Sequence, residues 1–168
     1  MEQLLANISL DDYDYFVQTK EMSEEERESF LLNFKPNPEK TTLGFLVIGG
    51  AFSEGIDLVS DRLIGAVIIG IGMPRINFES DKIAEFYDSR DLPGRDYAYL
   101  NPGMNKVMQA VGRVIRGDND KGIALLIDER YLTKSYRDLF RSEWKDYSVI
   151  TSKEDLKEEC ENFWRNNK

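Results

Sequence analysis

Gly122-Ile-Ala-Leu-Leu-Ile127 is a continuous apolar run that follows a polar turn, Gly117-Asp-Asn-Asp-Lys121, and it predicts a buried strand. Two similar runs lie upstream, Leu43-Gly-Phe-Leu-Val-Ile48 and Ala66-Val-Ile-Ile-Gly-Ile71. Strands that are apolar on both faces are typical of parallel sheets covered by helices. Because segments with helical spacing alternate with these runs, the sequence predicts an α/β layer fold.

Shorter signals predict the elements around these strands. Tyr15-Phe-Val-Gln18 is a short strand candidate, and Ser23-Glu-Glu-Glu26 has the pattern of a capping box before a helix that Pro36 closes. Asn101-Pro102 predicts an N-cap followed by proline at the first position of another helix, with Gly117 at its end.

The chain is expected to form one domain. Residues 1–168 contain no internal repeat, and the core is expected over about residues 1–146. Helical stretches are predicted over 133–145 and, as a C-terminal helix, over about 152–165, where Ser152 is the cap candidate. Phe163 and Trp164 are expected to dock this helix on the body of the domain.

Composition excludes several kinds of chemistry. The 168 residues include no histidine and one cysteine, Cys160, which excludes Ser-His-Asp and Cys-His nucleophiles, an internal disulfide and a metal site built on His or Cys ligands. The net charge of −9 makes the chain a poor general binder of nucleic acid. No apolar run approaches the ~20 residues that cross a bilayer, and no secretory signal is evident, so the cytoplasm is the expected compartment.

One charged stretch suits a polyphosphate ligand. Gln109-Ala-Val-Gly112-Arg113-Val-Ile-Arg116 places an amide and two guanidiniums at i, i+4 and i+7, which is one face of a helix. Two such cations can spread over several phosphate oxygens and stabilise charge that develops during transfer. Spacing alone leaves a second interpretation open, a solvated basic stripe on an amphipathic helix.

A glycine-rich loop follows the run that ends at Ile48. It reads Gly49-Gly50-Ala-Phe-Ser53-Glu54-Gly55-Ile-Asp57. Glycines at the carboxyl end of a strand allow close approach of a ligand, and open α/β sheets usually bind ligands there. A plain turn with a polar rim is the alternative interpretation.

Two partial motifs are rejected. Gly70-Ile-Gly72 begins a dinucleotide fingerprint, but Arg75 replaces the third glycine. The run into Asp128 and Glu129 imitates a Mg²⁺-binding strand end, yet the chain has no Gly-Lys dipeptide and therefore no phosphate loop. Asp128 is instead expected to end a core strand and to pair with a cation such as Arg130, and no metal site is predicted.

Two stretches, in this order, resemble signatures of a known family. Residues 50–58 are similar to motif V, and residues 109–116 to motif VI, of superfamily 2 DNA helicases of the XPD/DinG group. Residues 120–130 also resemble the sequence that follows motif VI, and the likeness extends to about residue 140.

The resemblance implies half of a motor. In this family two RecA-like domains hold ATP and Mg²⁺ between them, and single-stranded DNA crosses their top. The chain resembles the second, C-terminal domain, a RecA-like (P-loop NTPase-type) α/β domain with a mainly parallel sheet flanked by helices. It is expected to lack its first strand, as a truncated sheet whose open edge would favour self-association.

The family's phosphate loop, Mg²⁺-binding acids and iron–sulphur cysteines lie in the N-terminal domain, so any iron–sulphur cluster is expected only there. The isolated chain, without Walker A and B motifs, is therefore not expected to turn over ATP. The implied function is the C-terminal motor domain of an ATP-dependent DNA helicase, whose partners are the N-terminal helicase domain and single-stranded DNA, with no membrane.

The resemblance also assigns nucleotide-binding residues. Arg113 and Arg116 would be arginine fingers that reach the γ-phosphate of ATP, and Gln109 would orient within the nucleotide cleft. Gly112 would belong to the same nucleotide-binding set. A second group would couple the nucleotide to DNA.

That coupling group lies in the loop after the first long strand. Asp57 would approach the ribose or couple to the arginines, and Gly55 and Glu54 would link the nucleotide cleft to the DNA. Ser53, together with Glu54, would contact the DNA itself.

Two other function classes stay open. One is a non-catalytic helicase-like module that binds a protein partner without turnover. The other is a small α/β nucleotide-binding enzyme that acts alone, which the lack of a phosphate loop disfavours.

Overall fold

The computed structural model describes residues 9–52, 58, 60–115, 120–144 and 146–167. Its strands and longer helices are β1 (Asp14–Val17), α2 (Glu24–Leu32), β2 (Thr42–Phe45), β3 (Gly65–Ile69), α3 (Phe78–Asp88), α4 (Asn101–Val111), β4 (Ile123–Ile127), α5 (Lys134–Arg137) and α6 (Lys153–Asn166). Single turns of 3-10 helix lie at Ser60–Arg62, Glu129–Leu132 and Ser142–Trp144, and a π-helical turn spans Asp96–Leu100.

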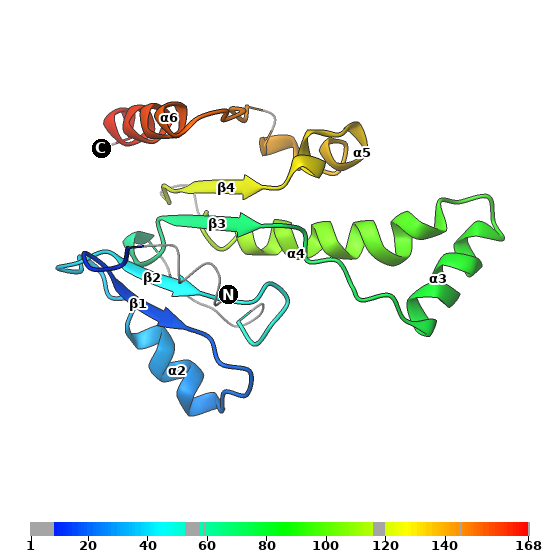
Figure 1. Cartoon of the computed structure of the whole chain (residues 1–168), viewed down its shortest axis with the longest axis horizontal. Helices are drawn as coiled ribbons and strands as arrows, with labels where there is room; N and C mark the ends of the chain where they lie inside the picture. Colours follow the sequence, from blue (N-terminus) through cyan, green and yellow to red (C-terminus); the bar gives the residue numbers. More distant parts are fainter. Residues whose placement is uncertain (1–8, 53–57, 59, 116–119, 145, 168) are drawn as a thin grey trace.

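The strands form two parallel pairs. β1 pairs with β2, from Asp14 opposite Thr42 to Val17 opposite Phe45, and β3 pairs with β4, from Gly65 opposite Ile123 to Ile69 opposite Ile127. All four strands run in about the same direction (Figure 1). The predicted α/β class with parallel strands is confirmed, although the described residues hold two two-stranded sheets instead of one continuous sheet.

The first pair is covered by α2, and the predicted capping box forms. The Ser23 hydroxyl accepts a hydrogen bond from the Glu26 backbone N–H at 3.3 Å, and the Glu26 carboxylate accepts one from the Ser23 N–H at 2.7 Å. This cap lets the helix start directly after the β1 loop and directs Phe30 and Phe34 at the sheet, where both pack against Phe16. These rings form a separate small core with Phe52 and Leu58.

The second pair is covered by α4, which runs antiparallel to β3 (Figure 1). Met104 and Val107 are fully buried and pack with Ile68 of β3 and with Leu100. Burial of each such side chain contributes about 1.5–3 kcal/mol. The outer face of the pair stays open, because Val67, Ile69 and Ile127 are 62%, 57% and 46% exposed.

The predicted start of this helix is wrong. Asn101 is not a cap, because its φ of −62° and ψ of −46° are helical, and the π-helical turn already precedes it. Tyr99 explains the earlier start: its ring is buried, and its hydroxyl donates a 2.6 Å hydrogen bond to Asp81 of α3. Pro102 stands at the second position of α4, in the first turn of the helix, where proline is tolerated.

The C-terminal region agrees with the prediction only in part. The helix predicted over 133–145 is wrong, since α5 ends at Arg137 and a 3-10 turn follows. The chain bends there because the Phe140 ring contacts three aromatic rings, those of Tyr131, Trp144 and Tyr147.

α6 is confirmed, with the Ser152 hydroxyl accepting from the Asp155 N–H at 3.0 Å. Phe163 and Trp164 contact each other, with ring centroids 5.0 Å apart, but neither belongs to a core cluster of the described residues. The expected docking through these two rings is therefore not seen. Within the part of the chain that the structure describes, every helix falls short of the length and hydrophobicity needed to cross a membrane.

Candidate functional site at the two ends of helix α4

Helix α4 spans the second sheet from one edge to the other. A Cβ added at Gly103 would meet Ile71 and Met73, which follow the carboxyl end of β3. A Cβ added at Gly122, just before β4, would meet Val114, which follows α4. The helix therefore begins at the carboxyl ends of β3 and β4 and ends beside their amino ends.

The amino-edge end carries the predicted nucleotide-binding side chains. α4 stops at Val111, and the next residues tighten into a 3-10 pattern, with hydrogen bonds from Arg113 N to Ala110 O (3.2 Å) and from Val114 N to Val111 O (2.9 Å). The helix expected to continue as far as Gly117 is thus shorter than predicted, because Val114 must turn inward to pack against Gly122.

Three of the predicted site residues lie at this end. Gln109 is exposed on the last turn of α4, Gly112 is the C-cap, and Arg113 is half-buried directly after it. Partial burial limits the freedom of the Arg113 side chain while part of it stays open to solvent. Ser53, Glu54, Gly55, Asp57 and Arg116 lie outside the described residues, so their placement stays a prediction.

The carboxyl edge carries the glycine loops. Gly49, after β2, has a φ of 73°, and Gly70, after β3, has a φ of 79°, a left-handed conformation that favours glycine. The Gln18 side chain fixes the first loop, because its Oε1 accepts a 3.0 Å hydrogen bond from the Val47 N–H. The structure thus confirms a glycine turn here.

Lys106 of α4 reaches this carboxyl edge, and sequence reasoning missed it. A Cβ added at Gly49 would lie 3.1–3.3 Å from the Lys106 Cδ, Cε and Nζ atoms, and one added at Gly72 would lie 3.3 Å from Cδ. The available signal was its position three residues before Gln109, which extends the polar stripe by one helical turn.

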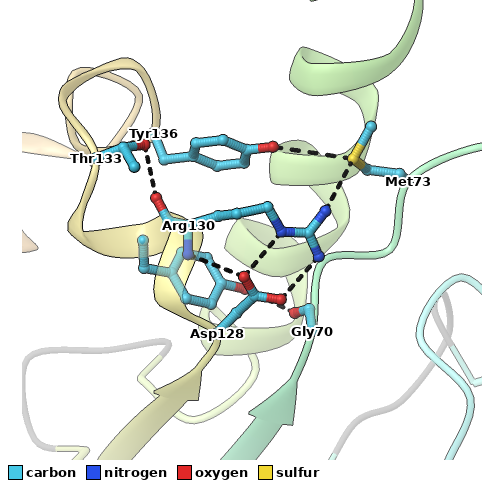
Figure 2. A network of polar contacts seen from close by, with 7 residues as sticks. Gly70, Met73, Asp128, Arg130, Thr133 and Tyr136 are labelled. Atoms are coloured by element: carbon cyan, nitrogen blue, oxygen red, sulfur yellow. Dashed lines mark hydrogen bonds and ion pairs between the residues drawn. The ribbon is translucent and has the colours of Figure 1, made fainter.

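The end of β4 holds a network of polar contacts (Figure 2). Arg130 donates from Nε and from a terminal nitrogen to the two carboxylate oxygens of Asp128, at 2.8 and 2.7 Å. The prediction that Asp128 ends a strand and pairs with Arg130 is confirmed. Among the described residues, no group of three His, Cys, Asp or Glu side chains is placed to hold a metal ion.

This pairing shifts the ionisation of its members. Hydrogen bonds from the Arg130 side chain hold the pKa of Asp128 below its usual value, and the Asp128 carboxylate raises the pKa of Arg130 in turn. Burial, with the nearby Asp128 charge, raises the pKa of Tyr131 to about 12. The Tyr131 hydroxyl therefore stays protonated and donates a 2.8 Å hydrogen bond to Gly70 O, which ties the ends of β3 and β4 together.

A hollow of about 300 Å³ lies beside this network. Its lining includes three residues of the network, Met73, Arg130 and Tyr136, together with Arg95, Asp96, Tyr99, Leu100 and Ser135. Both charge signs line it, so it does not select an anion or a cation.

Helix α3 was also missed by sequence reasoning. Asn77 caps it by accepting a 2.8 Å hydrogen bond from the Ser80 N–H, a signal present in the sequence. The helix projects from the body (Figure 1) and exposes Phe78 and Phe86, 74% and 50% accessible, beneath the cations of Lys82 and Arg90.

A comparison with protein families identifies the family of this chain. Residues 1–147 match the family model described as the helicase C-terminal domain. That match includes every element from β1 to α5 and both ends of α4.

Individual relatives of known name agree with the family match. The chain is 32% identical over 117 residues to the ATP-dependent DNA helicase DinG of Photobacterium profundum, which is 67% of this chain and 16% of that protein. It is 36% identical over 104 residues to the ATP-dependent DNA helicase chl-1 of Caenorhabditis elegans, which is 58% of this chain and 12% of the relative. The chain thus spans a small fraction of these relatives.

The fold also matches a solved structure. A structure of apo XPD superposes with a TM-score of 0.60 and 24% sequence identity, covering 82% of this chain and 27% of the other. This likeness supports the fold alone, a RecA-like arrangement of parallel strands and helices.

Proposed function

We propose that this chain acts as the C-terminal motor domain of an ATP-dependent DNA helicase. The chain belongs to the helicase C-terminal domain family, in the group of the XPD and DinG helicases. The observation that carries the proposal is the family match over residues 1–147, which includes the stretch from Gln109 to Arg113 at the accessible end of α4. In this proposal residues 1–168 form one domain, with its core in about residues 1–146.

The amino-edge end of α4 is the proposed nucleotide-facing surface. Arg113 and Arg116 would stabilise the negative charge that develops on the γ-phosphate during transfer, an effect worth about 10³–10⁵ in rate for arginine fingers in related enzymes. Gln109 would orient the nucleotide, and Gly112 would let the backbone approach it closely. ATP brings the phosphoryl group, and its Mg²⁺ would be held mainly by the N-terminal helicase domain.

Half-burial of Arg113 supports this role. A guanidinium held by its surroundings loses less conformational freedom when it meets a phosphate than a fully exposed one. The 3-10 turn that follows α4 moves Arg113 off the regular helical position, so the arginine is directed by tertiary packing of Val114 and not by helix geometry alone.

The loop between β2 and β3 is the proposed link to DNA. Asp57, Gly55 and Glu54 would report the nucleotide state, and Ser53 with Glu54 would contact single-stranded DNA. Gly49 and Gly50 begin this loop, and Gly49 lies against the Lys106 side chain of α4.

The test supplies an N-terminal helicase domain from a DinG relative, either in trans or fused to this chain, and measures ATPase activity with and without single-stranded DNA. DNA-stimulated hydrolysis that disappears with Arg116→Ala supports the proposal. A stable complex with no hydrolysis would instead favour the non-catalytic interaction module.

The open face of the second sheet has a consequence for the isolated chain. Val67, Ile69 and Ile127 expose an apolar surface, which favours self-association at high concentration. Sedimentation velocity of the wild type and of Val67→Thr/Ile69→Thr measures this tendency, and equal sedimentation of both would exclude this face as the contact.

A further inference from the structure

Lys106 occupies an unusual position for a surface lysine. Its aliphatic stem runs alongside the backbone of two loops that come from different strands, at Gly49 after β2 and at Gly72 after β3. Both positions are glycine, and a Cβ at either would crowd the stem at 3.1–3.3 Å. The Lys106 side chain therefore fits here because Gly49 and Gly72 carry no side chains.

The ammonium group has no protein partner in the part of the chain that the structure describes. Neither a hydrogen bond nor a salt bridge joins Lys106 Nζ to another described residue, although the side chain is half-buried. Two other lysines, Lys82 and Lys134, pair with acidic residues on their own helices. A cation that is held in place but left unpaired is suited to an anionic ligand.

The position of Lys106 decides which anion fits. Lys106 lies seven residues before Arg113, so the two Cα atoms are about 10 Å apart along the helix axis at ~1.5 Å per residue. Lys106 meets the carboxyl-edge loops, whereas Arg113 lies beside the amino edge. At this distance the side chains of Lys106 and Arg113 could reach one ligand, so the choice between a nucleotide phosphate and a DNA phosphate depends on the loop that Lys106 contacts.

We propose that Lys106 binds a backbone phosphate of single-stranded DNA at the carboxyl edge, where the Gly49 and Gly72 loops position its side chain. This inference rests on the proposed helicase function. The loop that holds Lys106 begins four residues before Ser53, which the proposed function already assigns to the DNA path. A fixed ammonium gives local attraction that a chain with a net charge of −9 otherwise lacks.

The experiment uses the chain assembled with an N-terminal helicase domain and a fluorescent 15-nucleotide oligothymidylate as the probe. Lys106→Met keeps the aliphatic stem between the glycines and removes only the charge, so it preserves the packing. Lys106→Arg restores the charge. The matched control is Lys157→Met on α6, where the lysine is 78% exposed and lies 3.8 Å from Glu161.

We expect Lys106→Met to weaken oligonucleotide binding about tenfold at low salt. The slope of log K against log salt should become shallower by about 0.7, the value for one phosphate contact on a single strand. Lys106→Arg should recover most of that slope, whereas Lys157→Met should match the wild type. Circular dichroism and urea unfolding of each variant identify any loss of fold.

Several outcomes would overturn the inference. If Lys106→Met binds the oligonucleotide with the affinity and slope of Lys157→Met, Lys106 does not contact DNA. If it loses affinity for a non-hydrolysable ATP analogue while oligonucleotide binding is intact, the phosphate belongs to the nucleotide. In both cases the proposed helicase function is still supported if the wild-type assembly shows DNA-stimulated ATPase activity. A wild-type assembly that neither binds DNA nor hydrolyses ATP faster in its presence contradicts that function as well.

Discussion

The middle of α4 and its C-terminal end differ in how they hold a polar side chain. At the carboxyl edge the helix is regular, and Lys106 projects between two glycine loops that leave space for its stem. At the amino edge the helix has tightened into a 3-10 turn, and Arg113 is directed by the inward packing of Val114. The position of Lys106 thus depends on two glycines that leave space, and the position of Arg113 depends on the buried Val114 side chain.

This difference shows how one helix can serve two surfaces. Met104 and Val107, on either side of Lys106 in the sequence, are fully buried and fix the centre of α4 on the sheet. A ligand that shifts one end must therefore move the helix as a whole or deform this packed centre. The predictions below separate the two ends and then test the centre that joins them.

The largest effect is expected for Arg113→Ala at the amino edge. In the assembly with an N-terminal helicase domain, DNA-stimulated ATP hydrolysis should fall at least about 10³-fold, because an arginine finger stabilises transition-state charge. Oligonucleotide affinity should stay within about twofold of that of Arg165→Ala, a control on the exposed end of α6. Steady-state ATPase and anisotropy measure the two quantities, and a rate within tenfold of the wild type would contradict the nucleotide role of this end.

The centre of α4 is tested by Met104→Ala. Met104 is fully buried, so its truncation should lower the free energy of unfolding by about 2–5 kcal/mol. Asn105→Ala, one residue along on the exposed side of the helix, should change it by less than about 0.5 kcal/mol. Urea denaturation gives both values, and similar stabilities for the two variants would mean that this packed centre does not fix α4.

Gly122→Ala sharpens the comparison at the amino edge alone. The added Cβ would lie 2.2 Å from the Val114 Cγ1 atom and 3.0 Å from Ile64 O, so Val114 must move. The cost should be about 1–3 kcal/mol of unfolding free energy. Gly65→Ala is the matched control, because its Cβ would meet only Ile123 O, at an ordinary 3.5 Å. If Gly122→Ala is as stable as the control, the inward packing of Val114 is not what positions Arg113.

The sequence predicted the strands correctly, but it did not predict features that depend on tertiary contacts, such as the start of α4. The apolar runs around β2, β3 and β4 predicted parallel strands because their composition suits burial on both faces. The start of α4 was wrong because the buried Tyr99 extends the helix backwards through a π turn, which no cap residue signals.

The candidate site was predictable to the same limited extent. Gln109 and Arg113 were identified by their spacing and by family resemblance, and the pairing of Asp128 with Arg130 was expected from their proximity in sequence. Lys106 was not, because its importance comes from contacts with Gly49 and Gly72, more than thirty residues away. Which end of α4 lies at which edge of the sheet likewise depends on the direction in which α4 crosses β3.

The smallest effect is expected at the carboxyl edge, in the pair of Asp128 and Arg130. The pKa of Asp128 is lowered in the folded chain, so the pair stabilises the fold above the carboxyl group's ordinary pKa of 3.8, and this stabilisation is lost as the pH falls through the lower folded value. Because the Arg130 side chain is 43% exposed, solvent screening limits the effect to about 1 kcal/mol at pH 7.

Asp128→Asn measures this contribution. The difference in unfolding free energy between the wild type and the variant should be about 1 kcal/mol at pH 7. It should shrink as the pH falls below 4, because Asp128 is then protonated in the unfolded chain before it is protonated in the folded one. Ser89→Ala, which removes an exposed hydroxyl that donates to the Phe86 carbonyl oxygen at the end of α3, should give a difference that does not vary with pH in this way. If the difference in unfolding free energy for Asp128→Asn is the same at pH 7 and pH 3, hydrogen bonding and not charge joins β4 to Arg130. The hydrogen bond from the Tyr131 hydroxyl to Gly70 O would then be the contact that joins the ends of β3 and β4.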